Sequence, residues 1–225
     1  MMTGGKHDRH VTATVSSPPL PPPTGPAVAG PPPAARQAGT DEPIYESTRR
    51  RVKLRITADT LSYGPTTMQA SEITELAFWM PKPGHHRVHL EGGTTGLSFR
   101  LVGRGTGGLT ARDEYVRVVA WLESRALPRL LQGRLARVGM GLTVRIGRLE
   151  LREGGMRWRG RVRSSEVRWD AFDHVAVTRK YVTVMTRTGR GKLRPFARLP
   201  LNELNAVLLP MLVPAAATSF GPRTH

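Results

Sequence analysis

The two halves of the chain share one pattern of alternating residues, and this repeat limits the folds open to the chain. "TADTLSYG" in the first half places Leu61 and Tyr63 two residues apart, and "EGGMRWRG" in the second half places Met156 and Trp158 at the same spacing. Further along, "SEITELAF" lies over "DAFDHVAV". Apolar residues at every second position share one face of a β-strand. Repetition of the pattern predicts two structurally similar units.

Each half then changes to a helical spacing. In the first half Thr110 begins the helical pattern, in which Tyr115, Val118 and Leu122 follow at the spacing of one helix face. Pro128 is expected to bend or end this helix. The second half closes with "LNELNAVLLPMLV", a second apolar helix. The sequence therefore predicts a mainly β chain with capping helices, an α+β class.

The first 47 residues differ in composition from the rest. Pro18 to Pro33 consists largely of Pro, Ala and Gly, which cannot bury enough apolar surface to offset the entropy of ordering. We expect a disordered tail of polyproline II character, acting as a solvated linker or as a PxxP ligand for a groove-binding partner. The predicted organisation is a tail at 1–47, a first domain at 48–137, a second domain at 138–216 and a flexible C-terminus at 217–225.

Two segments of the second half resemble a known family. Gly155 to Gly160 ("GMRWRG") and Trp169 to Val175 ("WDAFDHV") are similar to the bacterial pleckstrin-homology-like (PH-like) domain, whereas the first half has Ala70 and Ser71 near the position of Trp169. The resemblance implies two tandem PH-like bent sheets or partly open barrels, each closed by a C-terminal helix. It also implies non-catalytic domains that bind lipid headgroups, peptides or proteins, often at membranes.

The chain is strongly basic. Its net charge is +17, from 34 Lys and Arg residues against 17 Asp and Glu residues. Such a charge favours anionic partners, which include nucleic acid, acidic lipid surfaces and acidic proteins. A GC-rich codon bias would also raise the number of arginines, but it leaves the shortage of acids unexplained. The tail is close to neutral, so the excess charge belongs to the predicted domains.

The densest basic segment is "MRWRGRVRS". Four arginines alternate there with other residues: Arg157, Arg159, Arg161 and Arg163. In an extended strand their guanidiniums share one face, and each guanidinium can chelate phosphate through two parallel hydrogen bonds. We place this segment around the connection of the first and second strands, where PH-like domains often hold headgroup-binding cations. The alternative is a solvated edge strand whose charge prevents aggregation.

Further basic residues complete the predicted anion-binding set. They lie in two glycine-rich segments: Arg187, Arg190, Lys192 and Arg194 in one, and Arg104 in the other. A third cluster, Arg49 to Arg51, stands at the junction with the tail. Clusters of this kind gain about 1 kcal/mol per cation near an anionic leaflet.

The segment around Arg104 also matches a nucleotide-binding fingerprint. In "LVGRGTGGLT", Gly103, Gly105 and Gly108 satisfy G-x-G-x-x-G after a strand-like run. A dinucleotide site needs a second parallel strand after the helix, and no β-branched apolar run follows here. Gly-Arg-Gly recurs at 189–191, where the rest of the fingerprint fails. We therefore expect both loops to join a sheet to its closing helix, and no nucleotide cofactor.

The sequence gives little support for a catalytic site, a metal site or a base-stacking site. The chain has no cysteine, and no nucleophile elbow, H-E-x-x-H or Walker loop occurs. His85, His86 and His89 are interpreted as exposed hairpin histidines rather than metal ligands. Trp158 and Trp169 are expected in the core, because a nucleic-acid site would expose them beside the arginines.

These patterns predict a non-enzymatic binding or scaffolding module without cofactor, metal or small-molecule substrate. Its partner is expected to be an anionic surface, either acidic membrane lipids or a membrane-associated protein complex. The alternative is a regulatory nucleic-acid-binding protein. No signal peptide is recognised, and the longest apolar stretch, Ala206 to Ala217, is too short to span a bilayer. We therefore expect a cytoplasmic protein, peripheral at the inner face of the membrane.

Overall fold

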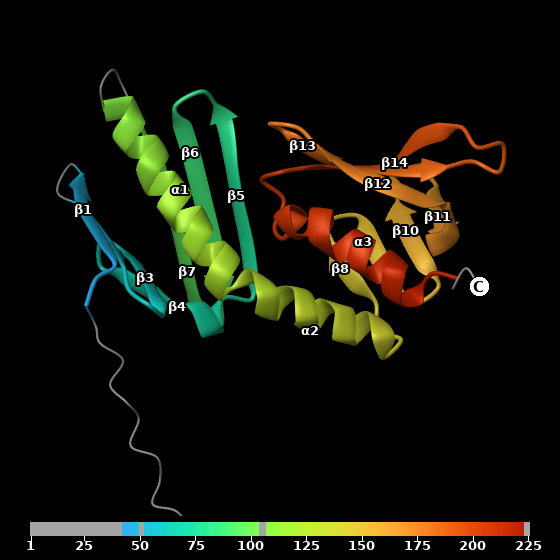
Figure 1. Ribbon diagram of the computed structural model, residues 1–225, viewed down its shortest axis with the longest axis horizontal. Coiled ribbons are helices and arrows are strands. Elements are labelled where there is room, and N and C mark those ends of the chain that lie inside the picture. Colours follow the sequence, from blue (N-terminus) through green and yellow to red (C-terminus); the bar gives the residue numbers. More distant parts are fainter. Residues whose placement is uncertain (1–41, 50–51, 104–106, 223–225) are drawn as a thin grey trace, which may run out of the picture. The chain divides into compact units, whose positions relative to one another are not determined.

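Figure 1 shows the computed structural model, which describes residues 42–49, 52–103 and 107–222. The proline-rich part of the predicted tail and the last three residues lie outside the described residues. The first strand begins at Tyr45, inside the predicted tail, and the last helix runs to Phe220, beyond the predicted end of the second domain. All the described residues belong to one compact unit of the chain.

The first half contains two antiparallel sheets in which each strand pairs with its neighbours along the chain. The four-stranded sheet consists of β1 (Tyr45–Arg49), β2 (Val52–Ile56), β3 (Thr60–Tyr63) and β4 (Thr66–Gln69). A 3-10 helix, Ala70–Glu72, leads into the three-stranded sheet. That sheet consists of β5 (Glu75–Lys82), β6 (His85–Gly92) and β7 (Thr95–Val102).

Two consecutive helices follow. Helix α1 (Gly107–Arg125) begins three residues before Thr110, the predicted start. Helix α2 (Leu127–Gly139) has Pro128 in its first turn. Proline is tolerated there because the backbone N–H that it lacks would have no acceptor within the helix. The predicted break at Pro128 is therefore confirmed, and it separates two helices.

The second half repeats this order of elements. Its four-stranded sheet consists of β8 (Val144–Ile146), β9 (Leu149–Arg152), β10 (Gly155–Arg159) and β11 (Ser164–Arg168). After a 3-10 helix, Trp169–Ala171, come β12 (Phe172–Val177), β13 (Tyr181–Arg187) and β14 (Leu193–Pro200). A 3-10 turn, Ala206–Leu208, and α3 (Leu209–Phe220) close the chain. The described chain is thus mainly β, as predicted, with four open antiparallel sheets and a C-terminal helix.

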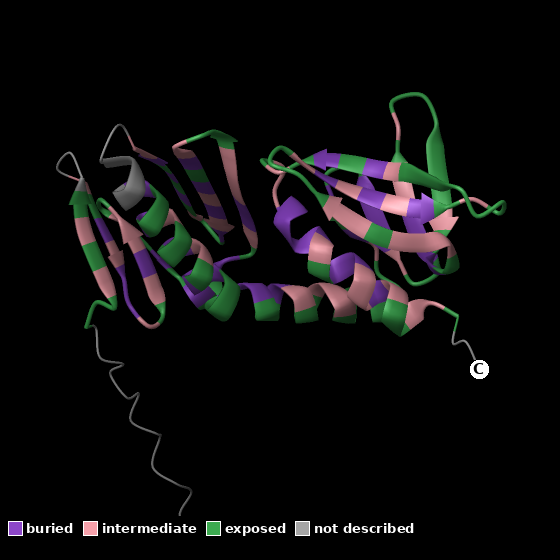
Figure 2. Ribbon diagram, turned by 45° about the horizontal axis from the view of Figure 1, so that its top comes forward, coloured by how far each residue is buried: buried purple, intermediate pink, exposed green. Residues whose placement is uncertain are grey.

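The repeated motifs occupy equivalent strands. "TADTLSYG" includes β3 and "EGGMRWRG" includes β10, each the third strand of its half. Leu61 and Met156, which the repeat aligns, are 0% and 1% exposed. Figure 2 shows the alternation of buried and exposed residues along the strands. Two tandem PH-like domains remain a prediction.

One predicted loop is wrong. Gly189 to Gly191 connect β13 to β14, so this loop does not join the last strand to the closing helix. The residues that follow this loop, "KLRPFARLP", contain two prolines and have no regular alternation. They nevertheless form an edge strand, where proline is tolerated, and a register shift after Val184 skips Phe196.

Asn205, in the second half of the chain, forms hydrogen bonds with main-chain groups of β5 in the first half. Its Oδ1 accepts a hydrogen bond from the N–H of Leu76 at 3.2 Å, and its own N–H donates to the Leu76 carbonyl oxygen at 2.7 Å. Asn205 is 2% exposed and has φ of 63°. Asparagine adopts this left-handed conformation more readily than other residues with a side chain, apart from aspartate.

Arginines of helix α2 form a second set of hydrogen bonds, to main-chain groups of the first half. Arg129 donates to the carbonyl oxygens of Ala70, at 3.1 Å, and of Ile73, and Arg134 donates to that of Thr74 at 3.2 Å. These carbonyls lie between β4 and β5. The same helix packs against α3 and β8 of the second half, so α2 contacts both halves.

Replacement of Asn205 separates backbone conformation from hydrogen bonding. Asn205→Gly should lower the free energy of unfolding by about 1–3 kcal/mol, because the buried N–H of Leu76 loses its acceptor. Asn205→Ala should lower it by about a further 1–2 kcal/mol, because alanine resists the left-handed conformation. Urea unfolding followed by circular dichroism measures both values. Equal midpoints for the two variants would contradict the conformational part of this account.

Candidate anion-binding surface

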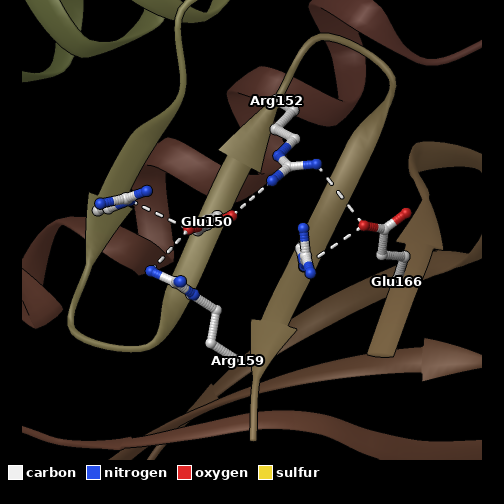
Figure 3. A network of polar contacts seen from close by, with 6 residues as sticks. Glu150, Arg152, Arg159 and Glu166 are labelled. Carbon is white, nitrogen blue, oxygen red and sulfur yellow. Dashed lines mark hydrogen bonds and ion pairs between the residues drawn. The ribbon is translucent and has the colours of Figure 1, made fainter. Parts of the chain in front are cut away.

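A buried carboxylate organises the predicted arginine patch (Figure 3). Glu150 of β9 has a side chain only 2% exposed. Its Oε1 accepts a hydrogen bond from Arg145 Nε at 3.0 Å, and its Oε2 accepts one from Arg152 Nη2 at 2.7 Å. Arg159 Nη1 lies 3.5 Å from Oε1. Guanidiniums from β8, β9 and β10 therefore converge on one carboxylate.

A second carboxylate extends the network across the sheet. Glu166 of β11 lies 3.6 Å from Arg152 Nη1 and 3.4 Å from Arg157 Nε. Figure 3 shows Arg152 between the carboxylates of Glu150 and Glu166. Two of the predicted anion-binding residues, Arg157 and Arg159, are thus already ion-paired within the sheet.

Burial and charge act in opposite directions on Glu150. Burial favours the neutral acid and raises the pKa, but the hydrogen bond from Arg152 and the charges of Arg145, Arg152 and Arg159 outweigh it, so the pKa of Glu150 is lowered. A carboxylate that stays ionised beneath three guanidiniums neutralises part of the basic patch and fixes the positions of its strands.

The predicted strand of four arginines ends early. β10 stops at Arg159, and Arg161 and Arg163 lie in the hairpin between β10 and β11. A Cβ on Gly160 would lie 2.1 Å from the carbonyl oxygen of Arg163, so this tight turn requires glycine. The four guanidiniums therefore do not share one strand face. The segment also lies on the third strand and the turn after it, not at the connection of the first and second strands.

The turn after β10, which we call the first tip (Arg161–Arg163), presents an apolar side chain between two cations. All three residues are exposed, and Val162 is 93% exposed. No ion pair joins Arg161 or Arg163 to a carboxylate in the part of the chain that the structure describes. The sequence pattern identified the two arginines but not the exposure of the valine between them.

The hairpin between β13 and β14 has a similar arrangement. Arg190, Lys192 and Arg194 are exposed, and Leu193, between the last two, is 43% exposed. We call Lys192–Arg194, the last residue of the turn and the first two residues of β14, the second tip. None of these cations has an ion pair among the described residues. Gly191, with φ of 74°, donates its N–H to the Thr188 carbonyl at 2.7 Å and closes the turn.

Arg187 differs from the other members of this predicted loop. Its Nε lies 2.6 Å from Oδ1 of Asp173, on the neighbouring strand β12. A hydrogen bond with His174 and the charge of Arg187 lower the pKa of Asp173, against the opposing effect of desolvation. Arg187 is therefore ion-paired within the sheet, although it was predicted to belong to the anion-binding set.

The structure thus divides the predicted set. Five cations are exposed on two hairpins of different sheets: Arg161, Arg163, Arg190, Lys192 and Arg194. Three are ion-paired on strands: Arg157, Arg159 and Arg187. Figure 2 shows the burial classes along the strands of this half. Arg104, Arg50 and Arg51 lie outside the described residues.

The aromatic residues of this half are largely in the core, as expected. Trp169 is 4% exposed, and its indole N–H donates to the carbonyl oxygens of Arg152 and Glu153 at 3.1 and 2.8 Å. Trp158 is half-buried against the core. Neither side chain is in the exposed class.

The histidine prediction is partly wrong. His86 is 5% exposed, and its ring stacks on Tyr115 with 4.4 Å between ring centroids. His89 Nε2 lies 2.9 Å from Glu91. Within the described ranges no group of three or more His, Asp or Glu side chains is placed to hold a metal ion.

Comparison of the chain with protein-family models and with curated proteins finds no match. Among the described residues, no helix combines the length and the apolar character needed to cross a membrane.

Neutralisation of Glu150 should change the response of stability to acid. A lowered folded-state pKa contributes stability that is complete above the unfolded-state pKa, near 4, and is lost as the pH falls through the lower folded value. Glu150→Gln should therefore be destabilised at pH 7 and should lose less stability than the parent chain on acidification.

Urea unfolding at pH 7 and at steps down to pH 3 measures this difference. Glu153→Gln is the matched control, because Glu153 is exposed and lies three residues away. Identical pH profiles for Glu150→Gln and the parent chain would show that the network contributes nothing to folding.

Proposed function

We propose that the protein is a non-catalytic module that binds an anionic membrane surface through its two hairpin tips. The observation that carries the proposal is the exposure, at each tip, of one apolar residue next in sequence to two cations that have no ion pair among the described residues. Such a sequence places an apolar group in the interfacial region while the flanking cations meet lipid phosphates.

The ion pairs of the sheet strengthen this assignment. Arg157 and Arg159 already have carboxylate partners, so a new anion at these residues would compete with Glu166 and Glu150. The five exposed cations have no such competitor among the described residues. At about 1 kcal/mol per cation near an anionic leaflet, the four cations of the two tips and Arg190 together supply enough free energy for reversible peripheral binding.

The repeated order of elements supports a related proposal about architecture. Each half has four strands, a 3-10 helix, three strands and a helical segment. This order is what two tandem PH-like domains would present, and both proposed domains would be binding modules rather than enzymes. We propose the inner face of the cytoplasmic membrane, or a protein complex attached to it, as the place of action.

Nucleic-acid binding is the second candidate function, and fewer features of the structure support it. The tip cations suit phosphate, but single-strand binding proteins add aromatic stacking. Trp169 is buried and Trp158 is half-buried. Binding to nucleic acid would therefore rest on charge alone and would fall steeply as salt rises.

Cosedimentation with vesicles tests the membrane proposal. The full chain should bind vesicles that contain phosphatidylglycerol and should bind pure phosphatidylcholine vesicles much less. Arg161→Glu combined with Arg163→Glu should weaken binding to the acidic vesicles at least about 30-fold, the equivalent of two lost cations.

The control must change the net charge equally. Arg87 and Arg100 are exposed cross-strand neighbours on β6 and β7, and Arg87→Glu with Arg100→Glu should retain most of the binding. Equal losses in both double variants would show that net charge alone drives association, and equal binding to neutral vesicles would overturn the proposal.

The apolar residue of the first tip distinguishes a membrane from a nucleic acid. Val162→Asp should weaken vesicle binding more than Val162→Ser, because aspartate adds a negative charge to the loss of the apolar group. Val162→Ser should leave a gel shift with a DNA duplex unchanged, since it removes no charge. Tight DNA binding without vesicle binding would favour the second candidate.

A further inference from the structure

A large groove lies away from the two tips. It is formed by helix α1, the β5–β6 hairpin, the turn after β12 and helix α3, and its volume is about 890 Å³. This size falls within the range of small-molecule sites, roughly 300–1,000 Å³. The Asn205–Leu76 hydrogen bonds join the elements on its two sides.

The walls of the groove expose apolar side chains to solvent. Val116 of α1, Val177 of β12 and Met211 of α3 are 54%, 54% and 44% exposed. Phe78 and Trp79 of β5 add aromatic side chains to the lining. Contiguous exposed apolar residues of this kind mark a surface that binds an apolar partner.

One end of the groove carries polar groups without a matching partner. His86 is 5% exposed, and its Nδ1 is buried without a hydrogen-bond partner in the described structure. Burial, followed by the charges of Arg112 and His85, lowers the pKa of His86. The imidazole is therefore neutral at pH 7, and Arg112, which also lines this end, supplies the positive charge.

The opposite end has the opposite charge. Glu123 lies eleven residues after Arg112 on α1, about 16 Å along the helix axis at 1.5 Å per residue. Tyr115 stands between them; burial and then the charge of Glu123 raise its pKa to about 12, so it keeps its hydroxyl proton. An anion is attracted at the Arg112 end and repelled at the Glu123 end.

We infer that the groove binds a single-chain amphiphile with a carboxylate head, of the long-chain fatty acid class. The carboxylate lies at Arg112 and His86, and the alkyl chain runs along Val116 and Trp79 towards Met211. This ligand satisfies the charge at one end, covers the exposed apolar side chains and places no charge near Glu123. The site is separate from the tips and does not depend on the proposed membrane binding, although the sequence alone predicted no small-molecule substrate.

Titration with 11-(dansylamino)undecanoic acid tests this site in the full chain, at concentrations below micelle formation. One equivalent should bind, with enhanced dansyl fluorescence and quenched tryptophan emission, since Trp79 lines the groove. Dodecanoate should displace the probe and dodecylamine should not. Octanoate and decanoate should bind progressively more weakly than dodecanoate, by up to about fourfold per methylene.

Exposed positions provide variants that should fold. Val116→Glu and Met211→Glu should each weaken probe binding at least tenfold, whereas Met140→Glu should not, because Met140 is 67% exposed and lies outside the groove. Arg112→Gln should weaken dodecanoate but leave dodecanol unchanged. Circular dichroism checks that each variant is folded.

Three outcomes would overturn the inference. They are absence of saturable probe binding, equal displacement by dodecanoate and dodecylamine, and equal loss of binding in Met140→Glu. If the probe fails to bind and the parent chain sediments as a dimer that Met211→Glu converts to a monomer, a second copy of the chain covers the groove instead. Vesicle binding by the tips is measured separately, so either proposal can fail alone.

Discussion

The burial of one carboxylate beneath three guanidiniums organises the second half of this protein. Glu150 is taken almost completely out of water, a costly step for a charge unless it is well paired. Arg145, Arg152 and Arg159 provide that pairing from three consecutive strands. The same contacts decide which arginines remain available, because those drawn towards Glu150 and Glu166 are no longer free to bind a partner.

Much of the fold could be predicted from the sequence, since alternation is a local property. The repeat predicted equivalent strands for Leu61 and Met156, and both are buried on the third strands of their halves. The break between α1 and α2 could also be predicted, from Pro128. The strand β14 was missed because Pro195 and the preceding glycines resemble a loop. It forms because β13 supplies pairing partners along its length, and such partners are not visible in a local pattern.

The sequence showed which residues form the basic patch, but not which of them are ion-paired and which are exposed. The alternating arginines of "MRWRGRVRS" are conspicuous, yet the sequence does not show where the strand ends and the turn begins. Arg159 and Arg161 consequently look equivalent, although one is ion-paired and the other is exposed at a tip. Glu150 is nine residues before Arg159, and only the strand register brings them together. The groove was not foreseen at all, because its walls come from segments more than 130 residues apart.

The arginines of α2 show that charge and structure are separable properties in this chain. Arg129 and Arg134 direct their guanidiniums at main-chain carbonyls between β4 and β5, and Nη2 of Arg129 donates to two of these carbonyls. Lysine would keep the positive charge but carries it on a flexible stem without the planar guanidinium. Some of the arginines thus join elements of the fold through hydrogen bonds. A homologous chain rich in lysine would keep the same electrostatic potential yet would need other means to hold its two sheets to the connecting helix.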